Sequence, residues 1–472
     1  MRIRTLVAGL LSGLLAGGCG SASTSTPEAE NSSSSSSGGS SSSSSSSSSG
    51  GSSSSSSGSG SSSSSGSSSG SGNIPPDNAS FQVGCDWFPA FDSQDHNVAF
   101  PETSATYWIA VGPSSPSADM QLQISGNYLD ARYFSLHVYD GSGAAKDHLP
   151  DYLIQPDSGS RNTFNAITQR SGAGSGGAYT AYLDFRNAPA VPAPNTLYRG
   201  TDLITTITGQ KRSYLMLRVY VPGNGTAADG GYQLPQLVLH SAGGDVPLSR
   251  TPDAANCQAL YDGFIQSSSA QHQTLVPSPP QNPPQFKSYG GDVLSKGYFR
   301  NQDIAYIYAT TTLKDGPIQL IRGQAPGFTD QAGGASAPQL RYWSICQNDY
   351  DTQQVSACIT DRDAVLDVTG YYTVVIADPA QRPANADTAD GFNFLPYGPT
   401  ADTGAVILRN MLPNAGFDQA AQNVPSGGDP ARVMGAYSPQ ATYCSRAVFE
   451  AAHGQSPAAV FAACKGASGL LP

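Results

Sequence analysis

Histidine is the side chain of this sequence best suited to act as an acid or a base near neutral pH, and the chain has six. His148 lies between Asp147 and Asp151, a spacing that could give an Asp–His pair, a metal site or simply a solvated turn. His137 lies in an aromatic and β-branched stretch, where it is either a half-buried strand residue or part of a site. We take His137 and His148 as the candidate residues. The weaker candidates are His96, His240, His272 and His453.

Acidic pairs are the other residues that could bind a ligand. Asp349 with Asp351, and the segment 387–391 with two aspartates, could bind calcium through carboxylate oxygens, although acidic turns more often only solubilise a protein. The segment 172–177 fits a dinucleotide-binding glycine pattern, but a predicted strand follows it, so a helix N-terminus is lacking there. We therefore expect no cofactor and no metal, with calcium as the alternative.

Cysteines suggest an oxidising compartment. Apart from Cys19 there are six, an even number that predicts three disulfides, although six cysteines allow fifteen pairings. We expect Cys346–Cys358 to close a short loop between adjacent strands, and Cys444–Cys464 to fix a C-terminal helical segment. The third follows by elimination, and a zinc site is the alternative. The expected pairs are Cys346 with Cys358, Cys444 with Cys464, and Cys85 with Cys257.

An internal repeat shows which elements carry these residues. The stretch 132–140 reads Arg-Tyr-Phe-Ser-Leu-His-Val-Tyr-Asp, and 341–349 reads Arg-Tyr-Trp-Ser-Ile-Cys-Gln-Asn-Asp. Two further stretches follow in the same order, 179–185 with 372–378 and 214–222 with 405–413. Each is a β-branched or aromatic run separated from the next by turn residues. Three ordered matches predict two copies of one β-rich module, and short strands with many turns favour an antiparallel sandwich or jelly roll.

The repeat also indicates where the copies differ. Cys346 occupies the position of His137, so the scaffold does not require a histidine there, and a site unique to the first half is one interpretation. Tyr214, Arg218 and Tyr220 alternate onto one face of a predicted strand, where aromatic rings beside a guanidinium could bind a glycan. The structural alternative, which we favour, is that each repeated arginine pairs with a neighbouring aspartate and closes a sandwich edge.

The repeated motifs resemble a known family. An aromatic-Ser strand and the strand Leu-Arg-Val-Tyr-Val-Pro at 217–222 are similar to the C-terminal β-sandwich of bacterial exported proteins in the domain-of-unknown-function families twelve-fifty-four and twelve-fourteen. The Asn-Phe-Leu-Pro stretch at 393–396 resembles that family's Asn-Trp-Leu-Pro. The resemblance covers roughly 103–223 and 303–414, and it implies a fold without an activity.

The N-terminal segment predicts export and lipid attachment. Arg2 and Arg4 precede an apolar run that is too short to remain as a membrane span. The run ends in Leu-Leu-Ala-Gly-Gly before Cys19, which resembles the lipobox of bacterial lipoproteins, so residues 1–18 are the expected signal peptide and Cys19 the lipidated residue. Ordinary signal-peptidase cleavage is the alternative. Gly20 in place of aspartate implies sorting to the outer membrane in Gram-negative lipoproteins.

A serine and glycine tract follows and cannot bury apolar surface, so we expect residues 19–72 to be a disordered tether. About fifty flexible residues reach roughly 40 Å from the bilayer. The net charge of the chain is −11. Without Arg2 and Arg4 it is −13, from 22 basic and 35 acidic residues, which argues against a nucleic-acid partner.

These observations predict an all-β protein of two tandem antiparallel β-sandwich, jelly-roll-like modules, residues 73–250 and residues 251–472, the second with short C-terminal helices. We expect a lipid-anchored outer-membrane protein whose folded part, in the periplasm or at the cell surface, is a binding or structural module. Its partners would be the bilayer, through Cys19, and a glycan or another envelope polymer. The alternative is a secreted hydrolase or lyase acting on an extracellular polysaccharide or ester, although no catalytic residues are identified.

Overall fold

The computed structural model divides the chain into two compact units, residues 1–72 and residues 73–472. The predicted signal peptide, Cys19 and the tether lie outside the described residues, as does His272. All described residues belong to the second unit. They are 84–113, 116–164, 177–201, 213–223, 231, 233–248, 254–271, 279–288, 299–329, 338–398 and 403–467.

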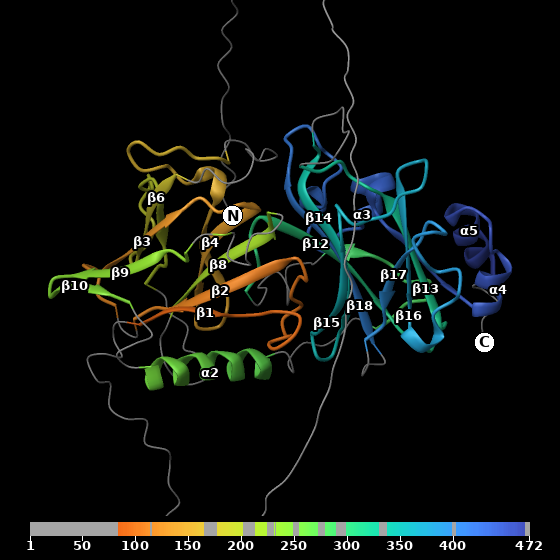
Figure 1. Cartoon of the computed structure of the whole chain (residues 1–472), viewed down its shortest axis with the longest axis horizontal. Helices are drawn as coiled ribbons and strands as arrows, with labels where there is room; N and C mark the ends of the chain where they lie inside the picture. Colours follow the sequence, from red (N-terminus) through yellow and green to blue (C-terminus); the bar gives the residue numbers. More distant parts are fainter. Residues whose placement is uncertain are drawn as a thin grey trace, which may run out of the picture. The chain divides into compact units, whose positions relative to one another are not determined.

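The first half of the folded unit contains two five-stranded sheets, coloured orange to green in Figure 1. Neighbouring strands are antiparallel except for β6 and β7, which are parallel. In spatial order the first sheet is β1 (Cys85–Pro89), β2 (Ala105–Val111), β8 (Ser213–Pro222), β4 (Ala131–Asp140) and β5 (Ala145–Pro150). The second is β10 (Gly244–Pro247), β9 (Gln236–Ser241), β3 (Gln121–Asn127), β6 (Ala178–Asp184) and β7 (Thr196–Tyr198).

The second half repeats this arrangement with one strand fewer in its second sheet. Its first sheet is β11 (Lys287–Ser288), β12 (Ile304–Thr311), β18 (Gly404–Pro413), β14 (Leu340–Asp349) and β15 (Val355–Thr360). Its second is β17 (Asn393–Pro396), β16 (Tyr371–Ala377), β13 (Ile318–Gln324) and β19 (Gln440–Cys444). Because each matched stretch of sequence falls on the equivalent strand, the predicted repeat and the predicted all-β sandwich fold are confirmed.

The central strands β4 and β14 are buried on both faces, although their sequences contain polar and charged residues. β3 alternates between buried and partly buried residues, as expected where one face of a sheet meets the core. All ten residues of β4 are buried, and so are all ten of β14. One face of these strands packs inside its own sandwich, and the other face packs against the other half of the chain. Tyr220 and Tyr342, for example, lie edge to face across that boundary with ring centroids 5.8 Å apart.

The three predicted disulfides are confirmed. Cys346–Cys358 joins the paired strands β14 and β15, and Cys444–Cys464 joins β19 to the helix α5 (Pro457–Ala467). Cys85–Cys257 connects β1 to the helix α2 (Ala254–Gln271) across 172 residues of sequence. This third disulfide therefore holds α2 beside β1, although the two elements are far apart in the sequence.

The predicted short C-terminal helices are present as α4 (Arg446–Ala451) and α5. Ser445 caps α4 by accepting a hydrogen bond from the amide of Val448. None of the described helices is long and apolar enough to span a bilayer. Besides α2 and α5 the helices are α3 (Pro430–Met434) and α4 (Arg446–Ala451), with 3₁₀ turns η1 (Asp151–Leu153), η3 (Pro379–Gln381), η4 (Ala421–Asn423) and η5 (Gly435–Tyr437).

Candidate functional site

Two reciprocal ion pairs join the halves. Arg132 of β4 lies 2.5 Å from Asp361, which follows β15, and Arg341 of β14 lies 2.7 Å from Asp151, which follows β5. All four side chains are fully buried. The structure therefore corrects our expectation that each arginine pairs with a neighbouring aspartate, because the partner comes from the opposite half. Each pair instead fastens one sandwich to the other.

The segment that precedes the first long strand of each half contacts an arginine of the other half, again in a reciprocal way. Arg218 donates to the carbonyl of Phe299, which precedes β12, and Arg409 donates to the carbonyl of Phe100, which precedes β2, at 2.8 Å. The amide of Phe299 donates to the carbonyl of Gly143 in the first half at 2.9 Å. The halves thus meet through matching surfaces, as two copies do in a symmetric dimer.

The two candidate histidines meet within this interface. His137 of β4 is directly opposite His148 of β5, and Cys346 is opposite Cys358 in the second half. A pair of imidazoles, with ring centroids 5.4 Å apart, therefore occupies the position of a disulfide. His148 Nε2 lies 3.1 Å from the carboxylate of Asp303, which belongs to the second half. His137 Nε2 accepts a hydrogen bond from the amide of Gln302 at 3.2 Å, and its Nδ1 lies 3.1 Å from Ser135 Oγ.

The surroundings of the two imidazoles shift their pKa values in opposite directions. Burial, together with the nearby charges of Arg218 and His148, lowers the pKa of His137 well below its ordinary value. Burial also lowers the pKa of His148, but the hydrogen bond and the charge of Asp303 outweigh it, so that pKa is raised. His137 and Ser135 are fully buried, with no access for a substrate in the part of the chain that the structure describes. The cluster therefore contributes to the contact between the halves.

The predicted aromatic binding face is covered. Tyr214, Arg218 and Tyr220 are 6%, 4% and 2% exposed. The guanidinium of Arg218 donates to Tyr139 Oη at 2.7 Å, and the ring of Tyr220 packs against Tyr342 of the second half. This face cannot bind a polymer from solution, because the other sandwich occupies it.

The acidic segments proposed for calcium form capped turns. Asp387 Oδ1 accepts hydrogen bonds from the amides of Ala389 and Asp390, and Asp349 Oδ1 accepts one from the amide of Thr352. Another group that brings potential metal ligands together among the described residues is Glu102 with Cys346 and Cys358. Both sulfurs there belong to a disulfide, so no thiolate remains to bind a metal.

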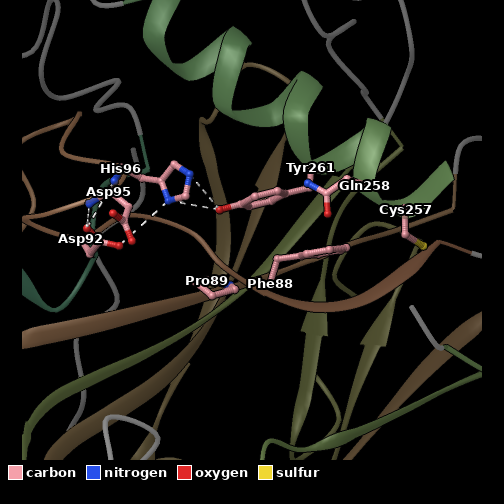
Figure 2. Close-up of a pocket in the computed structure, with 8 residues that line it drawn as sticks. All are labelled: Phe88, Pro89, Asp92, Asp95, His96, Cys257, Gln258 and Tyr261. Atoms are coloured by element: carbon pink, nitrogen blue, oxygen red, sulfur yellow. Dashed lines mark hydrogen bonds and ion pairs between the residues drawn. The ribbon is translucent and has the colours of Figure 1, made fainter. Parts of the chain in front are cut away.

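A pocket of about 350 Å³ lies between β1 and α2, a size typical of small-ligand sites. Figure 2 shows its lining residues converging from three parts of the chain: the end of β1, the loop that follows it and the first turns of α2. The Cys85–Cys257 disulfide joins the strand to the helix beside the pocket. The lining residues are Phe88, Pro89, Asp92, Asp95, His96, Cys257, Gln258 and Tyr261.

The loop of the pocket is held in one shape by Asp92. Its Oδ1 accepts hydrogen bonds from the amides of Gln94 and Asp95, both at 2.6 Å, and of His96 at 3.3 Å. The other carboxylate oxygen lies 4.0 Å from His96 Nδ1. Farther along the chain, the side chain of Asn97 exchanges two hydrogen bonds with the backbone of Val355 in the second half. Both ends of the loop are therefore fixed before a ligand arrives.

Two buried rings lie behind the opposite side of the pocket, those of Phe88 and Tyr261, which are 5% and 8% exposed. The rings of Phe88 and Tyr261 are stacked, with centroids 4.9 Å apart and planes 11° from parallel. Tyr261 Oη reaches across to His96 and lies 3.2 Å from its Nδ1. Burial, and then the negative charges of Asp92, Asp262 and Asp95, raises the pKa of Tyr261 to about 12. The phenol therefore stays neutral and can donate or accept a hydrogen bond.

The pocket combines an apolar wall with carboxylates, an imidazole, an amide and a phenol. The polar groups of this set that face solvent can bind a ligand with hydroxyl or amino groups. From the sequence, His96 was only one of the weaker candidates, and Asp92, Gln258 and Tyr261 were not identified as a site. The Asp-His dipeptide at 95–96 was the available signal, and the helical partner lies more than 150 residues away.

No protein-family model and no curated protein matches the chain. Solved structures do resemble it. One is an uncharacterized protein from Burkholderia cenocepacia, with 14% identity and a TM-score of 0.42, covering 71% of this chain and 80% of that one. Another is the VPA0106 protein from Vibrio parahaemolyticus, with 13% identity and a TM-score of 0.36, covering 73% of this chain and 90% of that one.

Proposed function

We propose that the chain is a lipid-anchored outer-membrane protein that presents a glycan-binding double sandwich on a flexible tether. The observation that carries the binding function is the pocket between β1 and α2, because the loop that carries its polar groups is already held in place by Asp92 and Asn97. A pocket whose shape exists before binding loses little conformational entropy when the ligand enters. The expected ligand is a sugar unit of an envelope or extracellular polymer.

The proposed location rests on the N-terminal sequence. The short apolar run, the small residues before Cys19 and the serine and glycine tract are the features of a lipoprotein leader and its tether. The resemblance of the repeated motifs to exported proteins of the domain-of-unknown-function families points to the same compartment. Three disulfides also fit an exported protein.

The location is tested by replacing Cys19 with serine in the whole chain. We expect the parent protein to incorporate a palmitate analogue and to fractionate with the outer membrane. The C19S variant should lose the label and leave the membrane fraction. A variant that still carries the label, or a parent protein that never does, would contradict lipid attachment at this cysteine.

Binding is tested with a variant that fills the pocket. Gln258 lines the pocket and is exposed, so Gln258→Trp should occupy the space without disturbing the core. Ala259 is the next residue of α2, is exposed and is not among the lining residues, so Ala259→Trp is the matched control. The whole chain in detergent is screened against immobilised envelope and extracellular glycans. We expect Gln258→Trp to abolish retention and Ala259→Trp to retain it; equal retention of both would contradict the assignment.

A hydrolase or lyase is the second candidate function, and one observation favours it. His96 lies between a carboxylate and a phenol in an accessible pocket, where its side chain is 27% exposed, and such an imidazole can transfer protons. Turnover distinguishes the two functions. A glycan that binds and is released unchanged after prolonged incubation supports the binding protein, whereas new reducing ends or unsaturated products that disappear in His96→Gln support the enzyme.

A further inference from the structure

The three disulfides differ in how closely solvent approaches their cysteines. Cys358 is partly exposed and lies on β15, the last strand of its sheet. Its partner Cys346 and the four cysteines of the other two disulfides are at most 5% exposed. A disulfide is broken by a thiolate that attacks one of its two sulfurs, so the reaction depends on access to a sulfur. In the folded protein, Cys346–Cys358 is therefore the disulfide most open to attack, through Cys358.

The charges around Cys346 suit the other step of such an exchange. When Cys358 is attacked, the electron pair of the broken bond leaves on Cys346. The guanidinium of Arg409 donates to Cys346 Sγ at 2.7 Å, and a neighbouring arginine stabilises a thiolate. The carboxylate of Glu102 opposes this effect, but it lies farther from the sulfur, at 3.6 Å, and accepts a hydrogen bond from Ser344 Oγ. Because a sulfur that is stabilised as a thiolate leaves faster, Arg409 favours Cys346 as the leaving group.

The internal repeat shows that the sandwich does not need a covalent link at this position. Strands β4 and β5 pair antiparallel, as β14 and β15 do. His137 lies opposite His148 in the first pair of strands, where the second pair has the disulfide. The equivalent strands of the first half are thus held together by backbone hydrogen bonds and packing. Opening Cys346–Cys358 should therefore leave β14 and β15 paired and the second sandwich folded.

From these observations we propose that Cys346–Cys358 is an exchange site for a dithiol, such as the reactive cysteine pair of an exported thiol–disulfide oxidoreductase. A thiolate of the dithiol forms a bond to Cys358 Sγ as the bond between the two cysteines breaks, and Cys346 leaves as a thiolate beside Arg409. The second thiol of the dithiol, once deprotonated, displaces Cys358 from the mixed disulfide. The dithiol leaves as a disulfide, and its two electrons and two protons remain with Cys346 and Cys358. This exchange is independent of glycan binding.

The test compares the three disulfides within one molecule. The oxidised whole chain in detergent is treated with dithiothreitol, a small dithiol, at about pH 8, where a free thiol is partly ionised. Samples are alkylated over time, and peptide mass spectrometry gives a rate for each disulfide. We expect Cys346–Cys358 to be reduced at least about tenfold faster than the two buried disulfides, which become accessible only when the structure opens. The circular dichroism of the β-sheets should persist at that stage. Equal rates for the three disulfides, or loss of this spectrum as Cys346–Cys358 opens, would overturn the proposal.

Glutathione, which has a single thiol, identifies the attacked sulfur. After an acid quench, the mixed disulfide should be found on Cys358, and a mixed disulfide on Cys346 would contradict the proposed direction of attack. Arg409→Met should slow the opening of this disulfide about fivefold, because the leaving thiolate loses its cation. Arg432→Met, at a side chain that is 87% exposed, is the matched control and should leave the rate unchanged. An unchanged rate in folded Arg409→Met would overturn the role of Arg409. If that variant unfolds, all three disulfides should open together, and the glutathione result on the parent protein then decides.

Discussion

Removing one arginine of the reciprocal ion pairs should have a large and pH-dependent cost. In Arg341→Met, the carboxylate of Asp151 remains fully buried and loses the cation that lies 2.7 Å away in the parent protein. It keeps the hydrogen bond from the amide of Phe134, at 3.0 Å. Breaking a buried pair in this way costs about 3–5 kcal/mol of unfolding free energy, because a charge is left in a medium of low dielectric constant.

The pH dependence follows from the pKa of Asp151. In the parent protein burial raises that pKa to about 6, against the lowering effect of Arg341. Without Arg341 it rises further. A carboxyl whose folded pKa lies above its unfolded value contributes most to stability at low pH, and this contribution is lost as pH rises through the folded pKa. The cost of Arg341→Met should therefore be largest at pH 8.5. As pH falls, the cost should shrink by about 1.4 kcal/mol per pH unit, until the Asp151 carboxyl of the parent protein is protonated as well.

Urea unfolding of oxidised protein, followed by tryptophan fluorescence at pH 8.5 and pH 5, measures the difference. Arg132→Met should behave alike, since burial also raises the pKa of its partner Asp361 to about 6. Arg432→Met is the control, because that side chain is 87% exposed and lies 3.8 Å from Asp429, so its loss should cost less than about 1 kcal/mol. A cost below about 1 kcal/mol for Arg341→Met at pH 8.5, or an equal cost at pH 5, would show that Arg341 does not stabilise a buried charge on Asp151.

Two further predictions concern the interface and the helix beside the pocket. His148→Gln should destabilise the protein more at pH 6 than at pH 9, because the raised pKa of His148 means that its stabilising pair with Asp303 is lost as pH rises; urea midpoints that shift equally at both pH values would contradict this. Replacing Cys85 and Cys257 by serine opens a loop of 172 residues and should lower the unfolding free energy by about 5 kcal/mol through loop entropy. The same change at Cys444 and Cys464, which are 20 residues apart, should lower it by about 3 kcal/mol. Thermal scans of the two double variants check this order, and the reverse order would count against it.

Sequence patterns predicted the repeated strands because burial in a sandwich leaves a local signature, alternation and β-branched residues between turns. They could not predict the partners of Arg132 and Arg341. Two equivalent arginines and two equivalent aspartates are compatible with pairing within each half or between halves. Only the fully buried second face of β4 and β14 distinguishes these arrangements, and that face arises from contact between distant segments.

The same limit applies to the sites. The exchange of His137 for Cys346 was visible in the repeat, but the exchange of His148 for Cys358 required the strand register. Together they show that the first half has two imidazoles where the second has a disulfide. The pocket was less visible still, because its aromatic and acidic sides lie on β1, its following loop and α2, which a disulfide joins across 172 residues. A helix docked in this way has no local sequence signal for its position.

A glycan that enters the pocket between β1 and α2 should slow amide hydrogen exchange around that pocket, which can be measured on the whole chain. Amide exchange is followed by mass spectrometry with and without a saturating concentration of the glycan that the protein retains. We expect new protection in peptides covering residues 88–96 and 257–262, and little change elsewhere in the two sandwiches. Protection confined to other segments, with these two unchanged, would contradict it.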